Sequence, residues 1–352
     1  MAQPRVRLKD IAIATGYSVN TVSLALRRSE RIPQETKDVI LATAQRLDYL
    51  PNHVARSLVS KATYTIGLVL TDITNPTLTL AARSIERRLN ERGYSMMFAA
   101  TDNVIANEIK ALDVLRSRQV DGILIFPTNH HEIDHIRRLR HAGYPIVLLG
   151  ADRDAGMDAV AIDERRGADK AVTHLIDLGH RAIAFLDAAG PLGNSEKYEG
   201  YERALKRHRI RVEPSMVLDP GGHGVTSGYR AMPDLMAGAK RPTALFCPTD
   251  NLALGALAWC RANAIRVPED LAIVGCDNIE AAEFADIPLT TIDYATDKVS
   301  DLAIERLLSL VEDETQPARV TLIDPDLVVR KSSGGALGSR PHASRGRKRP
   351  KA

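Results

Sequence analysis

The sequence has few of the features on which several classes of protein depend. Among its 352 residues there are only three cysteines, Cys247, Cys260 and Cys276, and their wide spacing provides neither a disulfide framework nor a CxxC metal pair. No apolar run approaches the ~20 residues that a membrane-spanning helix needs. The N-terminal MAQPRVRLKD lacks the apolar stretch of a secretory signal peptide. We therefore expect a cytoplasmic protein that is neither secreted nor integral to a membrane.

The composition is that of a globular protein, with 44% hydrophobic and 26% charged residues. At ~100–200 residues per domain, the length predicts two or three domains. The net charge of +3 is unevenly distributed: residues 1–62 carry ten Lys and Arg against five Asp and Glu, and residues 332–352 carry six against none. The remaining residues, 63–331, carry 31 basic and 39 acidic groups. Basic ends around an acidic middle suggest that the ends contact a polyanion while the middle has another role.

The basic head, residues 8–50, has the residue spacing of three short helices. The first ends at Gly16, Ser18 is a good N-cap for the second, and Pro33 fits the start of the third. Two short helices joined by a turn that contains Gly, with a third behind them, form a helix-turn-helix unit. The apolar positions that we expect to face inward are Leu8, Ile11, Ala12, Val22, Leu26, Val39, Ile40 and Leu47.

The second of these helices is the candidate reader of DNA. In a helix-turn-helix unit the N-terminal residues of the second helix contact base edges in the major groove, and here these are Val19, Asn20 and Leu24. Asn can pair with adenine through two hydrogen bonds, whereas Val and Leu can contact only the methyl group of thymine. The alternative is a three-helix bundle that packs against the next domain. The basic charge of the head favours DNA over that alternative.

The head also contains specific motifs, namely LKDIA at 8–12, TVS at 21–23, ETK at 35–37 and YLPNHVARSL at 49–58. Together with the Gly16 turn and Ser18, these motifs closely resemble the DNA-binding head of the lac-repressor-type (LacI/GalR) family of bacterial transcription regulators. Two positions depart from the family pattern. Leu24 stands where a basic or polar base reader is common, and Arg7 stands where a Thr often caps the first helix. The resemblance therefore implies DNA binding and leaves the preferred operator open.

The segment from Pro51 to Ser57, followed by Leu58, resembles the hinge helix of that family. Isolated helices need roughly 12–15 residues to be stable, so this one would fold only together with its partner and DNA. The resemblance implies that two copies, one per subunit, pair in the minor groove, where Leu58 inserts between base pairs and bends the duplex. The DNA-binding residues implied over head and hinge are Arg7, Ser18, Val19, Asn20, Thr21, Ser23, Leu24, Asn52, Ala55, Arg56 and Leu58.

In the acidic middle, short apolar runs alternate with amphipathic stretches. We expect buried strands at 66–70, 94–100, 122–126, 146–149, 183–186, 244–246 and 271–275. We expect helices at 79–92, 104–117, 133–142, 165–178, 196–208 and 251–263. This alternation predicts parallel sheets covered by helices on both faces. Because about 270 residues are many for one sheet, we expect two lobes, with a ligand site between them beyond the carboxyl ends of the strands.

The middle carries the motifs IGLVLTDITNP, VDGILI, HLIDLGHRAIAFL, RPTALFCPTDNLALGAL, RVPEDLAIVGCDN and PLTTI. They resemble the effector domain of the same family, which is similar to periplasmic sugar-binding proteins. The resemblance implies that the chain crosses between the lobes near 163, 290 and 323. The expected organisation is therefore a helix-turn-helix domain at 1–50, a hinge helix and linker at 51–62, a two-lobed effector-binding and dimerisation domain at 63–331, and a basic disordered tail at 332–352.

The resemblance also implies a set of effector-binding residues after the strands. They are Asp72, Thr77, Leu78, Thr128, Lys197, His223, Asp250 and Asp277. Thr77 and Leu78 replace an aromatic pair that is common in the family, which weakens the usual stacking platform. Lys197 stands where an Arg is usual, and Lys offers a point charge in place of a two-pronged donor. For each residue the alternative is a helix cap, a salt bridge or a lobe-closing contact.

Three other patterns point to catalysis only superficially. His131, Glu132 and His135 match the HExxH signature of zinc proteases, but they stand at a strand-to-helix junction where acidic residues suit a helix N-terminus. The Gly-rich segment 220–224 lacks the GKS/T ending of a phosphate-binding loop. Ser195, Lys197 and Tyr198 have the residue types of a short-chain reductase, but GxGxxG is absent. We expect neither a catalytic constellation nor a cofactor or metal.

The sequence thus predicts a ligand-responsive transcription regulator, a repressor by family resemblance, that binds a palindromic operator as a homodimer. The tail has no leucine heptads that could build a larger assembly, and its basic residues could add a salt-sensitive contact with nucleic acid. The expected effector is a sugar or sugar derivative. A periplasmic solute-binding protein and a zinc hydrolase are the two alternatives from other classes.

Overall fold

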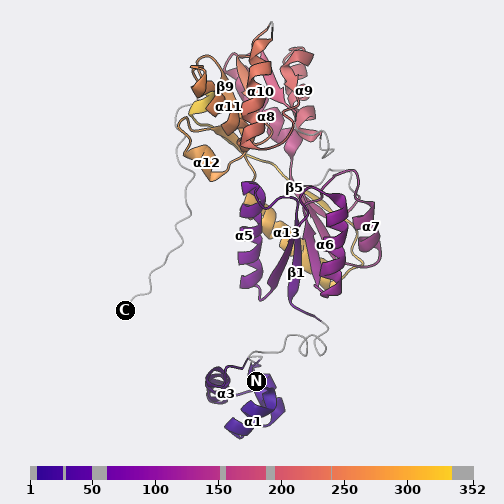
Figure 1. The fold of residues 1–352 in the computed structure, drawn as a ribbon. Coiled ribbons are helices and arrows are strands. Elements are labelled where there is room, and N and C mark those ends of the chain that lie inside the picture. The colour runs from indigo at the N-terminus through magenta and orange to yellow at the C-terminus, as the bar shows by residue number, and fades with distance from the viewer. Residues whose placement is uncertain are drawn as a thin grey trace. The chain divides into compact units, whose positions relative to one another are not determined.

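The structure, a computed structural model, describes residues 6–26, 29–49, 62–150, 156–187, 195–238 and 240–334. The chain divides into two compact units, Met1–Thr63 and Tyr64–Ala352 (Figure 1). The hinge residues Asn52, Ala55, Arg56 and Leu58 and most of the basic tail lie outside the described residues.

The first unit contains three helices, α1 (Leu8–Thr15), α2 (Val19–Leu26) and α3 (Gln34–Arg46). The predicted end of α1 is confirmed, because Gly16 adopts a left-handed conformation with φ 74° and its amide donates to the Ala12 carbonyl. The predicted N-cap of α2 is also confirmed. Ser18 Oγ accepts a hydrogen bond from the Thr21 amide at 3.0 Å.

The three helices enclose a small core of Ile11, Ala12, Val22, Ala25, Ile40 and Ala44. The expectation that Val39 faces inward is wrong, since its side chain is 44% exposed whereas that of Ile40 is fully buried. Successive residues on a helix are about 100° apart, so with Ile40 pointing into the core Val39 points toward solvent.

The second unit consists of two parallel-sheet lobes. Lobe 1 has the strand order β11-β5-β4-β3-β1-β2, and all neighbouring strands are parallel. Its strands are β1 (Thr65–Leu70), β2 (Ser95–Ala100), β3 (Gly122–Ile125), β4 (Ile146–Leu149), β5 (Ala159–Ile162) and β11 (Val320–Ile323). Lobe 2 has the order β12-β10-β9-β8-β6-β7, and only β12 runs antiparallel to its neighbour. Its strands are β6 (Ile183–Leu186), β7 (Val217–Leu218), β8 (Ala244–Phe246), β9 (Ala272–Asp277), β10 (Thr290–Asp293) and β12 (Leu327–Val328).

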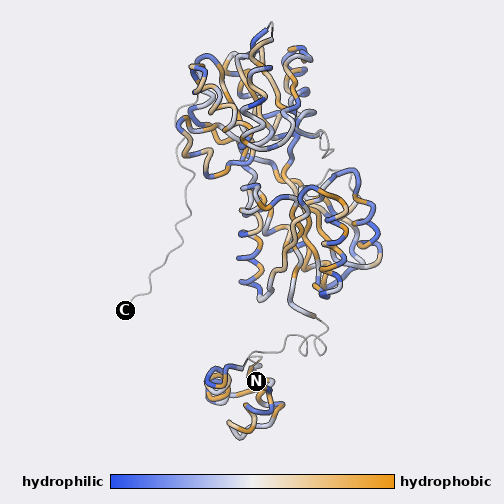
Figure 2. Tube along the Cα trace, in the orientation of Figure 1, coloured by the Kyte–Doolittle hydropathy of each residue, from blue (hydrophilic) through white to orange (hydrophobic). Residues whose placement is uncertain are grey.

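Helices cover both faces of each sheet, and the fold class predicted from the sequence is confirmed. In lobe 1 one face packs against α5 (Pro76–Glu91) and α13 (Thr296–Glu312), and the other against α6 (Ile105–Ser117) and α7 (Asp134–His141). In lobe 2 one face packs against α8 (Glu164–Asp177) and α9 (Glu196–Arg207), and the other against α10 (Val225–Ala237) and α11 (Asp250–Ala262). Figure 2 shows the apolar residues concentrated on the strands inside each lobe.

The chain passes between the lobes three times, after β5, after β10 and after β11, close to the positions that the family resemblance implies. The second passage brings α13 back into lobe 1, where Ile304 and Leu307 join the core around β1 (Figure 1). In lobe 2 the register of β9 and β10 pairs Asp277 with Asp293. The end of β9 therefore lies directly beside the second passage.

Two features of the lobes differ from the sequence prediction. Strand β2, expected to be buried, is an edge strand in which Phe98 is 59% exposed, because only one of its sides has a neighbouring strand. The sequence predicts that Ser332 and Ser333 belong to the tail, but both are buried in lobe 2. Ser332 Oγ donates to the Ile273 carbonyl at 2.6 Å and accepts from the Thr290 amide at 2.8 Å. Among the described helices, none combines the length and apolarity required to cross a membrane.

Candidate functional site

The first part of the candidate site lies where α8 and α9 begin. These helices approach closely because Gly200 has no side chain: a Cβ there would lie 2.2 Å from the Arg165 carbonyl oxygen. Lys197 is three residues before Gly200, so it lies near the same crossing point, one helical turn away. Glu164 is the first residue of α8 and directly follows the passage from lobe 1. The close crossing therefore brings Lys197 next to Glu164.

Lys197 is held by protein groups on two sides. Its Nζ donates to the Pro248 carbonyl at 2.9 Å and lies 3.4 Å from Glu164 Oε1. Burial lowers the pKa of Lys197, but Cys276, Glu164 and Asp277 together raise it more, so the pKa lies above its ordinary value. The ammonium group is therefore charged at any physiological pH.

The second part is the turn at the end of β9. Asp277 and Asn278 have positive φ values of 125° and 57°, which non-glycine residues adopt only under structural constraint. Asn278 Oδ1 accepts from Arg330 at 2.8 Å, and Asn278 Nδ2 donates to Asp293 Oδ1 at 3.3 Å. The Tyr294 amide donates to the Asp277 carbonyl at 3.4 Å. These bonds connect the turn to the second passage between the lobes.

The carboxyl group of Asp250 holds this turn in place through hydrogen bonds. Its side chain is fully buried, Oδ1 accepts from Thr291 Oγ1 at 2.6 Å, and Oδ2 accepts from the Ile279 amide at 2.9 Å. Burial raises the pKa of Asp250 to about 6 against the lowering effect of these hydrogen bonds. Because both oxygens already bind the protein, Asp250 positions the Asp277 turn and does not present a free face to a ligand.

Lobe 1 contributes Thr77, in the first turn of α5. This helix is capped by Asn75, whose side chain accepts from the Thr77 amide at 3.0 Å. Thr77 is 6% exposed, and its Oγ1 is buried without a hydrogen-bond partner of good geometry. Its hydroxyl nevertheless lies near enough to the Asp277 carboxyl group to oppose the increase in that group's pKa. Thr77 therefore offers a buried hydroxyl beside Asp277.

The structure brings only some of the predicted effector residues together. Thr77, Lys197 and Asp277 form the cluster, and His223 lies close enough for the charge of Lys197 to add to the effect of burial in lowering its pKa. Asp72 instead caps its own turn, accepting at 2.7 Å from the amide and the hydroxyl of Thr74. Leu78 packs in the core of lobe 1.

Thr128 belongs to a separate buried group in lobe 1. Its hydroxyl lies 3.0 Å from that of Thr101, and its amide donates to Glu108 Oε2 at 2.6 Å. The other oxygen of Glu108 lies 2.6 Å from His135 Nε2. His135 is on α7, whereas His131 precedes that helix, so the two do not share a helical face as a zinc-protease motif requires. Within the described ranges, no group of three or more His, Cys, Asp or Glu side chains is arranged to hold a metal ion.

Sequence reasoning missed Glu164, Tyr294 and Arg330. Glu164 is the second residue after β5 and Tyr294 is the first residue after β10, and the chain changes lobe at both places. This position beyond a strand is the signal from which both residues could be found. Arg330 gave no local signal, because its role comes from Asn278, 52 residues earlier in the chain.

The carboxyl group of Asp277 predicts a pH-dependent stability. Burial raises its pKa to about 8, and Lys197 opposes this increase. Because the folded protein holds this proton more tightly than the unfolded chain, where the pKa is near 3.8, the group's stabilising contribution is greatest below pH 4 and is lost as the pH rises toward 8. We expect the unfolding midpoint of Asp277→Asn, relative to that of the unmodified protein, to increase between pH 5 and pH 8. A constant difference in thermal melts across this range would contradict the assignment.

In the head, the candidate DNA-facing residues share one side of α2. Val22 and Ala25 are buried against α1 and α3, whereas Asn20 is exposed and Val19 is 45% exposed. Leu24 lies one turn beyond Asn20 and is half-buried. Of the other predicted residues, Arg7 and Ser18 are exposed, and Thr21 and Ser23 are partly so. The described part of the predicted reading surface is therefore accessible.

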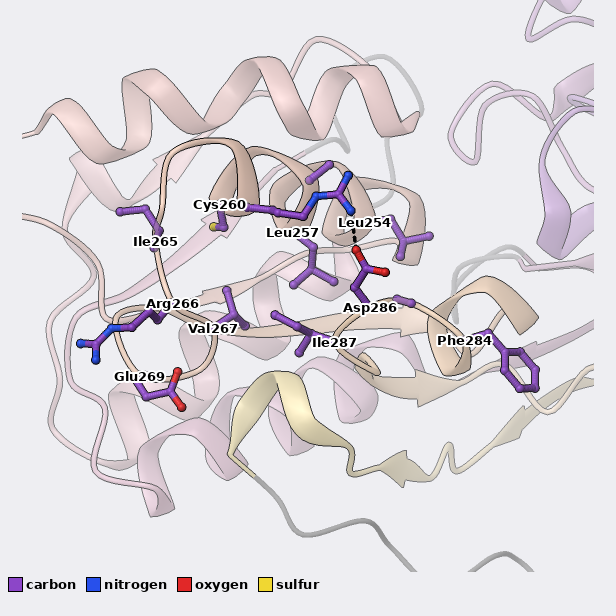
Figure 3. Close-up of a pocket in the computed structure, with 13 residues that line it drawn as sticks. Leu254, Leu257, Cys260, Ile265, Arg266, Val267, Glu269, Phe284, Asp286 and Ile287 are labelled. Atoms are coloured by element: carbon purple, nitrogen blue, oxygen red, sulfur yellow. Dashed lines mark hydrogen bonds and ion pairs between the residues drawn. The ribbon is translucent and has the colours of Figure 1, made fainter.

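A different feature, an apolar pocket of about 570 Å³, opens on lobe 2 beside α11 (Figure 3). Leu254 and Leu257 line it from α11, and Val267 and Ile287 line it from the following loops. Arg261 and Asp286, which both line the pocket, form an ion pair. Figure 3 shows Phe284 at one end of the pocket. The Phe284 side chain is 75% exposed. Four charged side chains also line this pocket, those of Arg261, Arg266, Glu269 and Asp286.

Two family models match the chain. A model described as bacterial regulatory proteins, lacI family, matches residues 7–52. A model described as periplasmic binding protein-like domain matches residues 172–333.

Two curated relatives match almost end to end. The chain is 32% identical over 333 residues to the HTH-type transcriptional repressor PurR of Haemophilus influenzae, covering 92% of this chain and 98% of that protein. It is 32% identical over 336 residues to the ribose operon repressor of Escherichia coli K12, covering 93% of this chain and 99% of that protein.

Solved structures show the same fold. The lac repressor dimer bound to operator and the anti-inducer ONPF matches with a TM-score of 0.84 and 24% identity, covering 94% of this chain and 99% of that one. The transcriptional regulator CelR in complex with cellobiose matches with a TM-score of 0.69 and 27% identity, covering 93% and 100%.

Proposed function

The chain belongs to the lacI family of bacterial regulatory proteins, and from this membership we propose that it is a cytoplasmic transcriptional repressor controlled by a small effector. The observation that carries the proposal is the capped α2 with accessible Asn20, in a chain similar over 92% of its length to a transcriptional repressor. Phosphate contacts would supply salt-dependent affinity, and α2 would select the sequence. The protein acts by binding, without a catalytic step.

We propose that the effector binds at the cluster of Thr77, Lys197 and Asp277. Thr77 belongs to lobe 1 and the other two to lobe 2, so a ligand that contacts all three favours one arrangement of the lobes. The Asp277 turn is bonded to Asp293 and Tyr294, where the chain passes back to lobe 1. Because linkage is reciprocal, operator DNA must change the affinity for effector by the factor by which effector changes the affinity for DNA.

We further propose that the protein acts as a homodimer on a roughly palindromic operator. Two exposed apolar surfaces support self-association. One is the edge strand β2 with Phe98, and the other is the pocket beside Phe284. The lac repressor in the matching structure is itself a dimer on its operator.

The test is selection of random duplex DNA on the purified protein, with and without a pooled library of sugars, at two salt concentrations. A symmetric motif whose recovery changes with the sugars is the expected result. A symmetric motif that no sugar affects would contradict the effector class. No enrichment at either salt concentration would contradict the DNA-binding function and favour a solute-binding protein.

Leu24 determines one base of the expected motif. Its side chain can contact only a thymine methyl group, whereas Arg can form two hydrogen bonds with guanine. We expect Leu24→Arg to move the preference toward guanine at one symmetric position, with a discrimination of about 1–3 kcal/mol.

The matched control is Val39→Arg, which adds the same charge on the exposed side of α3. It should change the salt-dependent affinity without changing the selected sequence. An identical motif for Leu24→Arg and the unmodified protein would remove Leu24 from the reading surface.

A further inference from the structure

The ammonium group of Lys197 has the position to bind an anionic ligand, but protein acceptors surround it. The Pro248 carbonyl accepts its hydrogen bond at 2.9 Å, and Glu164 Oε1 lies at 3.4 Å. Only 18% of the Lys197 side chain and 13% of the Glu164 side chain are exposed, so water screens this pair weakly. These two acceptors leave one of the three ammonium N–H groups, and an anion bound to it would lie next to the carboxylate of Glu164, in the first turn of α8.

The charges around Lys197 also oppose a second anion. Two carboxyl groups, those of Glu164 and Asp277, lie beside this lysine and act directly on its pKa. A phosphate or carboxylate entering the cluster would lie near Glu164 in a poorly screened environment, where like charges repel strongly. The same surroundings do not penalise an uncharged hydroxyl group.

The polar groups that face the cluster suit hydroxyl groups. Thr77 Oγ1 is buried without a partner of good geometry and can donate or accept one hydrogen bond. Asp277 lies beside it on a turn held by Asp250 and Asn278. A ligand hydroxyl beside Thr77 and Asp277 would give the buried Thr77 hydroxyl a hydrogen bond of good geometry.

We propose that Glu164 is a specificity-determining residue, which keeps Lys197 paired and makes the pocket select uncharged polyhydroxyl compounds over phosphorylated or carboxylated ones. This inference rests on the proposed effector site. It adds Glu164 to that site and predicts that anionic ligands are excluded. The reason is that the carboxylate of Glu164 neutralises the Lys197 ammonium group, which would otherwise attract an anion.

Orthophosphate is the direct probe, since it reports anion binding at Lys197 whatever the natural effector is. We expect the unmodified protein to bind orthophosphate weakly at pH 7 by isothermal titration calorimetry, and Glu164→Gln to bind it about tenfold or more tightly. The pH lies below the pKa of about 8 of Asp277, so that carboxyl group is mostly uncharged during the measurement. Lys197→Met in the Glu164→Gln background should abolish the gained binding.

Two further variants separate charge from structure. Glu164→Asp keeps the negative charge and should restore rejection of orthophosphate, which a merely structural role would not produce. Glu213→Gln removes an exposed carboxylate of the same lobe, paired with Lys240, and should leave orthophosphate binding unchanged. Thermal melts of all variants verify that each is folded.

Matched sugars extend the test to the effector class. D-Ribose with its 5-phosphate, and D-glucose and D-fructose with their 6-phosphates, are compared in pairs on the unmodified protein and on Glu164→Gln. We expect no phosphate ester to bind the unmodified protein more tightly than its free sugar. In Glu164→Gln the ratio of the two affinities should move toward the ester by about tenfold or more in any pair that binds.

Two results would overturn the inference. One is an equal affinity for orthophosphate in Glu164→Gln and the unmodified protein. The other is tighter binding of a phosphate ester than of its free sugar by the unmodified protein, lost in Lys197→Met. Neither result bears on the selection of DNA. If the protein selects a symmetric motif but responds to an anionic sugar, the role of Glu164 is refuted and the proposed function is retained. A protein that selects no DNA would refute the proposed function independently.

Discussion

Replacing Gly255 by Ala is expected to lower the free energy of unfolding by about 3 kcal/mol, because two helices of lobe 2 touch at this residue. A Cβ at Gly255 on α11 would lie 2.0 Å from the Val225 carbonyl oxygen and 2.6 Å from the Tyr229 nitrogen, both in the backbone of α10. Gly228 on α10 has the reciprocal position, where a Cβ would lie 2.1 Å from the Leu252 carbonyl oxygen. The helices must separate to accept either substitution. Urea unfolding followed by circular dichroism measures the loss.

Gly238→Ala is the matched control, at the C-terminal end of α10. Its φ of −59° suits Ala, and a Cβ would have only ordinary contacts, the nearest at 3.6 Å. This variant should not lower the free energy of unfolding, and the smaller conformational entropy of the unfolded chain is expected to raise it by up to about 1 kcal/mol. Equal stability of Gly255→Ala and Gly238→Ala would mean that α10 and α11 do not pack as closely as described.

Replacing Asp277 by Asn is expected to abolish the response of operator binding to the effector, with a loss of effector affinity of about a hundredfold. In the free protein this carboxyl group is mostly protonated at pH 7, but hydrogen bonds from ligand hydroxyl groups favour its charged form. The charge-assisted hydrogen bonds of that form are roughly twice as strong as those of a neutral amide. The measurement is operator affinity by fluorescence anisotropy, with and without the compound identified by the selection experiment.

The control for this prediction is Asp270→Asn, which removes an exposed carboxylate of lobe 2 that is paired with Arg266. It should retain the full response. Both variants should bind operator as tightly as the unmodified protein when no effector is present, because the head is unchanged. A normal response from Asp277→Asn would remove Asp277 from the effector site, and weaker operator binding without effector would indicate a structural defect.

The helices, strands and caps that the sequence predicts correctly are those stabilised by residues close to them in the sequence. Ser18 caps α2 through the amide of Thr21, three residues later, and Gly16 ends α1 with a bond to Ala12. Most of the expected strands and helices of the lobes agree with the structure to within a few residues, since apolar runs and helical periodicity are local patterns. The sequence patterns do not predict α10, α12 (Glu280–Glu283) or α13, nor the strands β5, β7, β10, β11 and β12. Helix α10 contains both Gly228 and Pro233, which weaken a helical pattern.

The predicted effector residues could not be sorted by role from the sequence. Asp250 and Asp277 both follow strands and both carry a carboxyl group, but only the first has both oxygens bound by the protein. The partner that makes this difference, Thr291, lies 41 residues beyond Asp250. Thr128 likewise satisfied the rule for a residue after a strand, yet its hydroxyl and amide are taken up by Thr101 and Glu108.

The family, the helix-turn-helix head with its cap and the two-lobed class of the remaining chain follow from the sequence alone, because motifs and periodicity are properties of consecutive residues. Which polar groups remain available to a ligand follows only from the three-dimensional fold. That availability depends on burial and on partners brought together by the fold, as when Pro248, 51 residues after Lys197, accepts its hydrogen bond while Glu164 neutralises its charge. The sequence gives the type of each side chain, but the groups that surround a side chain in the folded protein determine its electrostatic environment.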